Sequence, residues 1–179
     1  AGVMHPQSVA MGKRYHVPIH VRSTFTHESG TIIKDSYSKQ MESNLICGVA
    51  QDDNVARIAV LGLENMPGTA GMLFSELASN EVPVDMIVQS ARKLDDKTID
   101  IIFTVASTDL HQAKFVLEQM KKQGKINKVM YDDNCAKVSI VGPEMLGTPG
   151  VAARIFGSLG KDNINIDIVS TSKNSISCL

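Results

Sequence analysis

The chain has 179 residues, a formal net charge of -1 and 43% hydrophobic residues, with no Trp. This length allows one large domain or two small ones, and the composition is that of a folded globular protein and not of a disordered tail. The near-neutral charge gives no reason to expect nucleic acid or an anionic membrane as a partner, and no apolar run in the sequence is long enough to cross a bilayer.

The first 44 residues differ from the rest of the chain. Pro6 favours a short helix over residues 6–14, because proline is well tolerated in a first helical turn. Residues 17–23 are expected to form a strand, and residues 26–43 are polar and are expected to form an exposed connection. The chain opens on Ala1 and not on Met, as expected of a processed or excised piece of a longer protein.

A repeat occupies the remainder of the chain. Arg57-Ile-Ala-Val-Leu-Gly62 recurs 80 residues later as Lys137-Val-Ser-Ile-Val-Gly142. Pro67-Gly68, Phe74, Leu77 and Val84-Asp85 recur at an offset of 82. Each copy therefore predicts a strand, a helix begun at its Pro-Gly pair, and two more strands. The predicted strands are residues 57–62, 84–90 and 99–105 in the first copy, and 137–142, 166–171 and 175–179 in the second.

The first copy continues with a second helix and a fourth strand. Asp109 is placed to cap this helix and Gly124 to end it, and residues 126–131 form the strand. The buried face of the helix is expected to consist of Leu110, Ala113, Val116, Leu117 and Met120. The order βαββαβ predicts an α+β, ferredoxin-like module with two helices on one face of an antiparallel sheet. The second copy stops at Leu179 without these last elements, so either the chain has been cut or residues 45–50 fill an edge of that sheet, or both.

The repeat resembles the paired ACT modules in the regulatory part of aspartate kinase. The resemblance covers nearly the whole chain and rests on an ordered set of segments. In the second copy these are Val141-Gly-Pro-Glu-Met145, Thr148-Pro-Gly-Val-Ala-Ala153, Asn163-Ile-Asn-Ile-Asp167 and Ile168-Val-Ser-Thr-Ser172; in the first copy they are Pro67-Gly68 and Val84-Asp-Met-Ile-Val-Gln89. Met4-His-Pro6, Val17-Pro-Ile-His-Val-Arg22 and Gly30-Thr-Ile-Ile33 resemble the end of the kinase domain.

The resemblance implies a division into four segments. Residues 1–44 would be the C-terminal tail of the kinase domain with a linker, and residues 45–56 an edge strand or linker. Residues 57–134 would be the first ACT module and residues 135–179 the second, truncated one. The nucleotide motif of the family, of the Lys-Phe-Gly-Gly type, has no match in this sequence. ATP and Mg would therefore belong to the parent kinase, and this fragment, with no catalytic residue predicted, is expected to be inactive alone.

An amino-acid effector presents a carboxylate and an ammonium group. The amides at the start of the first repeat helix, those of Gly68, Thr69 and Ala70, are suited to the carboxylate. Oxygen atoms for the ammonium group could come from Asn65, Asp85 and Gln89; the last two share a strand face because they are four residues apart. The family arrangement implies that Asn165 and Ile166 close the site from a partner chain.

Each of these residues also has a structural interpretation. Asp85 could end a strand or pair with Arg92, Gln89 could be a cross-strand partner, and Asn165 could hydrogen-bond to its own turn. The repetition of Val-Asp as Ile-Asp in the second copy favours a functional role for Asp85. His16 and His20 have no third ligand at a suitable spacing, so no metal site is predicted. The three cysteines, Cys47, Cys135 and Cys178, each lie in an apolar run and are typical of buried hydrophobes in the reducing cytoplasm.

The resemblance implies an allosteric function. The chain would bind threonine and/or lysine and feedback-inhibit the phosphorylation of aspartate in lysine, threonine and methionine biosynthesis. It would work as a homodimer, joined to a kinase catalytic domain or subunit. Three positions depart from the family pattern: Asn65 stands where Asp is frequent, Pro83 replaces an Asn, and Lys173 stands where Glu is usual. One alternative is a dimerisation module with vestigial effector sites. Another is an enzyme of some other kind, although no nucleophile–base pair or metal set is present.

Overall fold

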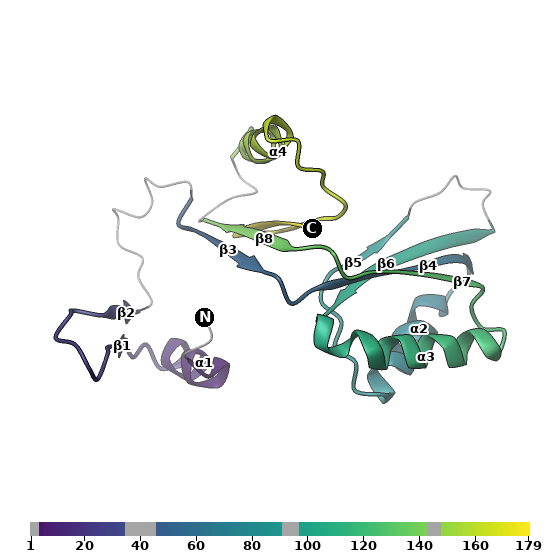
Figure 1. Ribbon diagram of the computed structural model, residues 1–179, viewed down its shortest axis with the longest axis horizontal. Coiled ribbons are helices and arrows are strands. Elements are labelled where there is room, and N and C mark those ends of the chain that lie inside the picture. Colours follow the sequence, from purple (N-terminus) through teal and green to yellow (C-terminus); the bar gives the residue numbers. More distant parts are fainter. Residues whose placement is uncertain (1–3, 35–45, 91–96, 143–147) are drawn as a thin grey trace. The chain divides into compact units, whose positions relative to one another are not determined.

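The computed structural model describes residues 4–34, 46–90, 97–142 and 148–179 (Figure 1). It divides into two compact units, Ala1–Asn44 and Leu45–Leu179. The first unit consists of α1 (Pro6–Arg14) and an antiparallel hairpin of β1 (Ile19–Val21) and β2 (Thr31–Ile33). The predicted helix is confirmed and the predicted strand is shorter than expected. The prediction of a connection over residues 26–43 is wrong at β2, and its second half, residues 35–43, lies outside the described residues.

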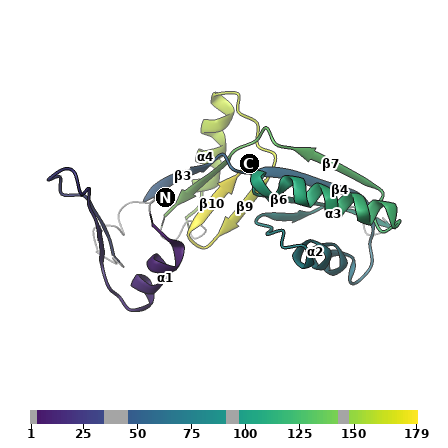
Figure 2. The ribbon, with the colours of Figure 1, turned by 60° about the horizontal axis from the view of Figure 1, so that its bottom comes forward.

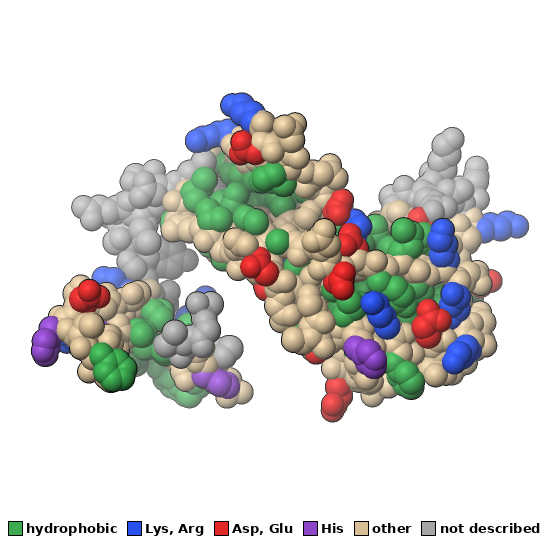
Figure 3. Space-filling model, in the orientation of Figure 1, with side chains coloured by type: hydrophobic (Ala, Val, Ile, Leu, Met, Phe, Trp, Pro, Cys, Tyr) green, Lys and Arg blue, Asp and Glu red, His purple; other side chains and the backbone are tan. Residues whose placement is uncertain are grey.

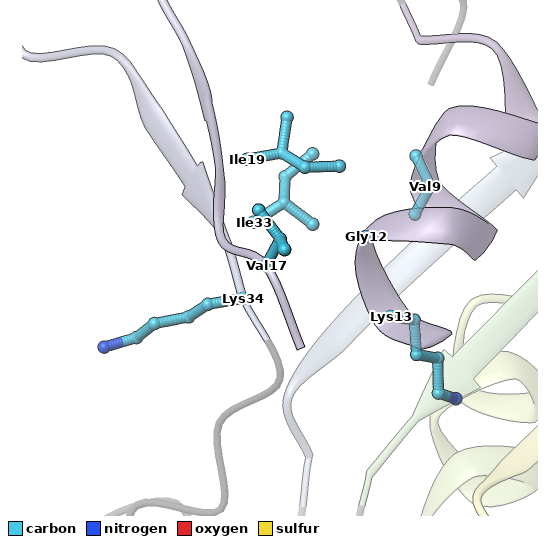
Figure 4. A pocket seen from close by; sticks show the side chains of 7 residues that line it. All are labelled: Val9, Gly12, Lys13, Val17, Ile19, Ile33 and Lys34. Atoms are coloured by element: carbon cyan, nitrogen blue, oxygen red, sulfur yellow. The ribbon is translucent and has the colours of Figure 1, made fainter. Parts of the chain in front are cut away.

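Helix α1 lies against this hairpin around a small apolar cavity of about 170 Å³. Figure 4 shows Val9 on the helix facing Val17, Ile19 and Ile33 of the hairpin. The approach depends on Gly12, where an added Cβ would lie 2.8 Å from Ile19 Cδ1. The unit also exposes large apolar side chains, such as the 95% exposed Phe25, and none of its described apolar residues is fully buried.

The first module, β4 to β7, is an antiparallel sheet with two helices on one face (Figure 1). The strand order is β5-β6-β4-β7, and the chain follows the predicted order βαββαβ. The elements are β4 (Ala56–Glu64), α2 (Thr69–Ser79), β5 (Ile87–Gln89), β6 (Thr98–Val105), a 3₁₀ turn at Ser107–Asp109, α3 (Leu110–Lys122) and β7 (Lys128–Asp132).

The core of the first module lies between its sheet and its helices. Alternate residues of the two central strands are buried, and the α2 residues Leu73 and Leu77 pack against them. The predicted apolar face of α3 is confirmed, since all five of its residues are buried. Gly124, at φ +71, ends this helix region as predicted. The side chain of Asp109 makes no capping hydrogen bond, because the 3₁₀ turn leads the chain directly into α3.

The sheet of the second module includes a strand that precedes the first module in the sequence. The strand order in this sheet is β3-β8-β10-β9, and β3 lies beside β8 as β7 lies beside β4 (Figure 2). In this register Val49 stands opposite Ile140. The chain therefore passes from the sheet of the second module into the first module and back. The elements are β3 (Gly48–Asp52), β8 (Lys137–Val141), α4 (Val151–Lys161), β9 (Val169–Ser172) and β10 (Ser175–Cys178).

Within the described residues, the second module has one helix where the first has two. The sheet face beside α4 consequently carries an open apolar groove of about 240 Å³. In Figure 3 hydrophobic side chains gather on this module below α4. The groove is lined mainly by Ile46, Val138, Ile140, Ile155, Leu159 and Cys178. The two modules have the α+β, ferredoxin-like fold that the repeat predicts, and the second is incomplete.

The sequence made predictions about the burial of the three cysteines and about where the two repeat helices begin. Cys178 is buried and Cys135 is half-buried, as expected, but Cys47 is exposed because β3 is an edge strand and its start lies at the sheet margin. Both repeat helices begin after a glycine in the left-handed region, Gly68 at φ +98 and Gly150 at φ +88, where glycine is favoured. None of the described helices is long and apolar enough to cross a bilayer.

Candidate effector site

The start of α2 offers backbone amides at the end of a tight turn. The amide of Thr69 donates to Met66 O at 3.2 Å, and its hydroxyl donates to Glu64 O at 2.9 Å. Thr69 is only 7% exposed, so this residue shapes the turn from within. The amides of Gly68 and Ala70 make no hydrogen bond to another residue in the described part of the chain. These two amides, together with the positive end of the helix dipole, can receive an anionic group.

Asn65 anchors the other end of the same turn. Its backbone amide donates to Lys97 O at 2.8 Å, which ties the end of β4 to the start of β6. Asn65 is exposed, beside the exposed Gly68. The structure thus brings Asn65 and the amides of Gly68 and Ala70 into one surface turn.

A β-bulge precedes β5 and determines the direction of Asp85. The Asp85 amide donates to Thr104 O at 3.0 Å, while the Thr104 amide donates to Met86 O at 3.0 Å. Two residues of one strand therefore oppose one residue of the other. Met86 also donates its amide to the Thr104 hydroxyl at 3.0 Å, which fills the bulge. The Asp85 carboxylate accepts a hydrogen bond from Lys137 Nζ at the start of β8, in the second module.

Gln89 points to the other side of the sheet. It stands opposite Ile101, which is buried in the core beneath the helices. Val88, its neighbour, packs with Ile102 in a cluster that includes Ile168 of the second module. The expectation that Asp85 and Gln89 share a strand face is therefore wrong, because the bulge lies between them and breaks the period of two. Arg92, the other suggested partner of Asp85, lies outside the described residues.

Asn165 and Ile166 lie in the loop between α4 and β9. Asn165 Nδ2 donates to Asp167 Oδ1 at 3.3 Å, so the amide bonds within its own loop in this chain. Ile166 is half-buried and packs against the cluster of Val151 and Ile155. The loop leads to β9, which is an edge strand of its sheet within the described residues, as is β5, the strand that contains Gln89.

Two basic residues near the site were not singled out from the sequence. Lys137 forms an ion pair with Asp85, and Arg57 forms an ion pair with Asp167 at 2.7 Å. The sequence does contain a signal for these two residues, because Arg57 and Lys137 are each the first residue of the first repeated strand in their copy.

Nothing in the described residues forms a group of three or more His, Cys, Asp or Glu side chains suited to a metal ion. His20 Nε2 instead lies 2.6 Å from Ser29 O, within the hairpin of the first unit.

Comparison with known proteins places these residues in a family. The family described as ACT domain matches residues 58–120 and 138–179, which together are more than half of the chain. An aspartokinase from Mycolicibacterium smegmatis is 39% identical over 180 residues, which cover 100% of this chain and 43% of that protein. The chain thus spans less than half the length of this relative.

Two solved structures are similar over the two modules. The regulatory subunit of aspartate kinase from Thermus thermophilus, in its ligand-free form, is 32% identical with a TM-score of 0.70. The match covers 75% of this chain and 87% of that one. A structure of aspartokinase alpha and beta subunits is 36% identical with a TM-score of 0.67, and the match covers 74% of this chain and 86% of that one.

Proposed function

Since the chain belongs to the ACT-domain regulatory regions of aspartokinases, we propose that it binds an end-product amino acid, threonine and/or lysine, and thereby feedback-inhibits the phosphorylation of aspartate by its kinase part. The catalytic residues, ATP and Mg would belong to that kinase part. The pathway served would be the biosynthesis of lysine, threonine and methionine.

The observation that carries this proposal is the position of the candidate residues at two sheet edges. Gln89 lies on the edge strand β5, on the helix side of the sheet, and the turn at Asn65 and Gly68 leads into α2 on that side. Asn165 and Ile166 lie just before the edge strand β9. Pairing of β5 in one chain with β9 in a partner would therefore bring both groups to one interface. The effector carboxylate would bind the Gly68 and Ala70 amides, with Thr69 shaping their turn.

Threonine fits this arrangement better than lysine. The proposed ammonium ligands on this face of the sheet are Asn65 and Gln89, and neither is a carboxylate. Asp85, the third residue predicted from the sequence, points to the opposite face and pairs with Lys137, so it is left out of this proposed site. A lysine effector brings a second ammonium group, for which no acid stands among these residues. A small hydroxylated amino acid requires only hydrogen-bonding groups.

The proposed assembly is a homodimer joined to a kinase catalytic domain or subunit. The exposed apolar side chains of the first unit, among them Tyr15, Val17 and Phe25, suit packing against a kinase domain. The working compartment would be the reducing cytoplasm. In keeping with this, the three cysteines, all within the described residues, form no disulfide.

Calorimetric titration of threonine and of lysine tests the site. We expect Gln89→Ala and Asn165→Ala to weaken threonine binding about tenfold to a hundredfold, because a hydrogen bond to a charged group contributes about 1.5–3 kcal/mol. Gln112→Ala, on the exposed side of α3, is the matched control and should bind as the unmodified chain does. Unchanged binding in both site variants would show that the residues are misassigned, and binding of lysine alone would show that the ligand is wrong.

A dimerisation module with vestigial effector sites is the second candidate. Two observations favour it: Asp85 is held by Lys137, and Asn65 stands where the family frequently has Asp. The same titrations separate the two functions, because a vestigial site gives no heat with either amino acid while the chain still dimerises.

A further inference from the structure

The two modules of the chain are joined by two ion pairs that mirror each other. Asp85 of the first module pairs with Lys137 of the second, and Asp167 of the second pairs with Arg57 of the first at 2.7 Å. The two acids are equivalent repeat positions, 82 residues apart, and the two bases are equivalent positions, 80 residues apart. Each module therefore presents an aspartate and a basic residue to the other at equivalent positions of the repeat. The arrangement resembles the two-fold symmetric interface of a homodimer, but it lies within one chain.

The backbone repeats this symmetry. The Asp167 amide donates to Leu179 O at 2.7 Å, and the Leu179 amide donates to Ile168 O at 2.9 Å. This is the bulge already described at Asp85 and Met86, formed again in the second copy. In both copies the bulge turns the aspartate side chain away from the helix side of its own sheet and toward the other module.

An apolar cluster lies between the two ion pairs. Met86 and Ile168, which are equivalent, are both buried there, and the equivalent residues Val55 and Cys135 join them. Cys135 Sγ lies 3.5 Å from Val55 O. The segments in which the chain crosses between the modules, residues 53–55 and 133–136, thus meet at the centre of the interface.

One of the two ion pairs is connected to a candidate effector residue. Asp167 accepts a hydrogen bond from Asn165 Nδ2 on Oδ1 at 3.3 Å while its Oδ2 binds Arg57 at 2.7 Å. Arg57 also binds Asp132 at 2.9 Å, at the end of β7. The side chains of Arg57, Asp132 and Asp167 are 29%, 35% and 36% exposed, less than that of Asp85, which is 60% exposed. A connected set of polar contacts therefore runs from Asn165 in the second module to β7 in the first.

We propose that the two reciprocal ion pairs form a clasp that fixes how the two modules pair, and that Asp167 connects this clasp to the effector. The first half stands on the contacts of this chain alone. The second half rests on the proposed function: an effector that takes the Asn165 amide removes a hydrogen bond from Asp167. This change alters the Asp167–Arg57 arm of the clasp, so effector binding changes the pairing of the modules.

The clasp is tested without any effector by hydrogen exchange on the full chain. Asp167→Asn and Lys137→Gln should each raise exchange in residues 53–55 and 133–136 by about twofold to fivefold, as expected for the loss of a partly exposed ion pair. Asp162→Asn, which removes an exposed charge at the end of α4 and outside both crossing segments, is the control and should leave exchange unchanged. The swap of Asp85→Lys with Lys137→Asp should restore protection that Lys137→Asp alone removes. Equal exchange in all variants, or a swap that restores nothing, would overturn the clasp.

The connection to the effector is tested by repeating the measurement at saturating threonine or lysine, whichever binds the unmodified chain. Binding should change exchange in the two crossing segments of the unmodified chain, and this response should be lost in an Asp167→Asn chain that still binds the ligand. An unchanged response in that variant, or no response in the unmodified chain, would overturn the connection. If neither amino acid binds the unmodified chain, the proposed function fails and the connection falls with it, while the effector-free measurement still decides the clasp.

Discussion

Tyr131 combines a buried hydroxyl with a half-buried ring on β7. Within the described residues its hydroxyl has no hydrogen-bond partner, and Lys114 Nζ lies 5.2 Å from the ring centroid. Burial, with a smaller contribution from Glu118, raises the pKa of Tyr131 from 10.0 to about 12. The folded chain therefore resists ionisation of this tyrosine more than the unfolded chain does.

We predict that Tyr131→Phe makes the chain less sensitive to alkaline pH. A raised folded-state pKa contributes stability that is fully present below pH 10.0 and is lost as the pH rises through about 12. At pH 7 the variant should be at least as stable as the unmodified chain, because no hydrogen bond is lost. Urea unfolding of both chains at pH 7, 10 and 11 measures this. Parallel pH dependence of the two unfolding free energies would contradict it.

Strand β3 belongs to the sheet of the second module, although the whole first module lies between them in the sequence. Among the strands of the described residues it pairs with β8 alone and lies at the edge of its sheet. Alternate amides of such an edge strand point toward the neighbouring strand and toward solvent. A proline on the inward-pointing positions removes a ladder hydrogen bond, whereas a proline on the outward positions is tolerated.

We predict that one of the two variants Val49→Pro and Ala50→Pro destabilises the second module by about 1 kcal/mol or more, and that the other is well tolerated. Each variant serves as the control for the other, since they are adjacent residues of one strand. Hydrogen exchange should rise in β8 and β10 but not in β4 and β6. A rise of equal size in β4 and β6 would show that β3 supports the first module as well.

At the scale of the whole molecule, the edge strands of the two sheets have no strand partner on their outer side within the described residues, and such edges can pair with another chain. Ile87 on β5 is 53% exposed, and Met130 on the opposite edge strand β7 is 54% exposed. The proposed dimer joins β5 of one chain to β9 of its partner and leaves β7 outside the contact.

We predict that Ile87→Arg shifts the chain toward the monomer, while Met130→Arg, which adds the same charge at an equally exposed edge position, leaves it dimeric. Light scattering at micromolar concentration, with effector present, measures the mass. A monomeric unmodified chain under these conditions would count against the dimer. Equal dimerisation in the two variants would place the contact elsewhere.

The sequence by itself determined the order of helices and strands in the two modules, but not strand β2 of the first unit. The periodic apolar positions of α3 all became buried, and the Pro-Gly pairs preceded both repeat helices, because these features depend on contacts within one segment. The surface turn around Asn65 and Gly68 could be located for the same reason: its amides belong to the start of a helix that the local pattern predicts.

The tertiary structure alone decided where the side chains of Asp85 and Gln89 point. A period of two places them on one face, but the bulge at Asp85 and Met86 depends on a hydrogen bond with Thr104, 18 residues away, and it reverses that direction. The repetition of the Val-Asp pair was visible in the sequence, and the reciprocal clasp gives a structural reason for it. That reason requires the two modules to face each other, which is a property of long-range packing that no local pattern contains.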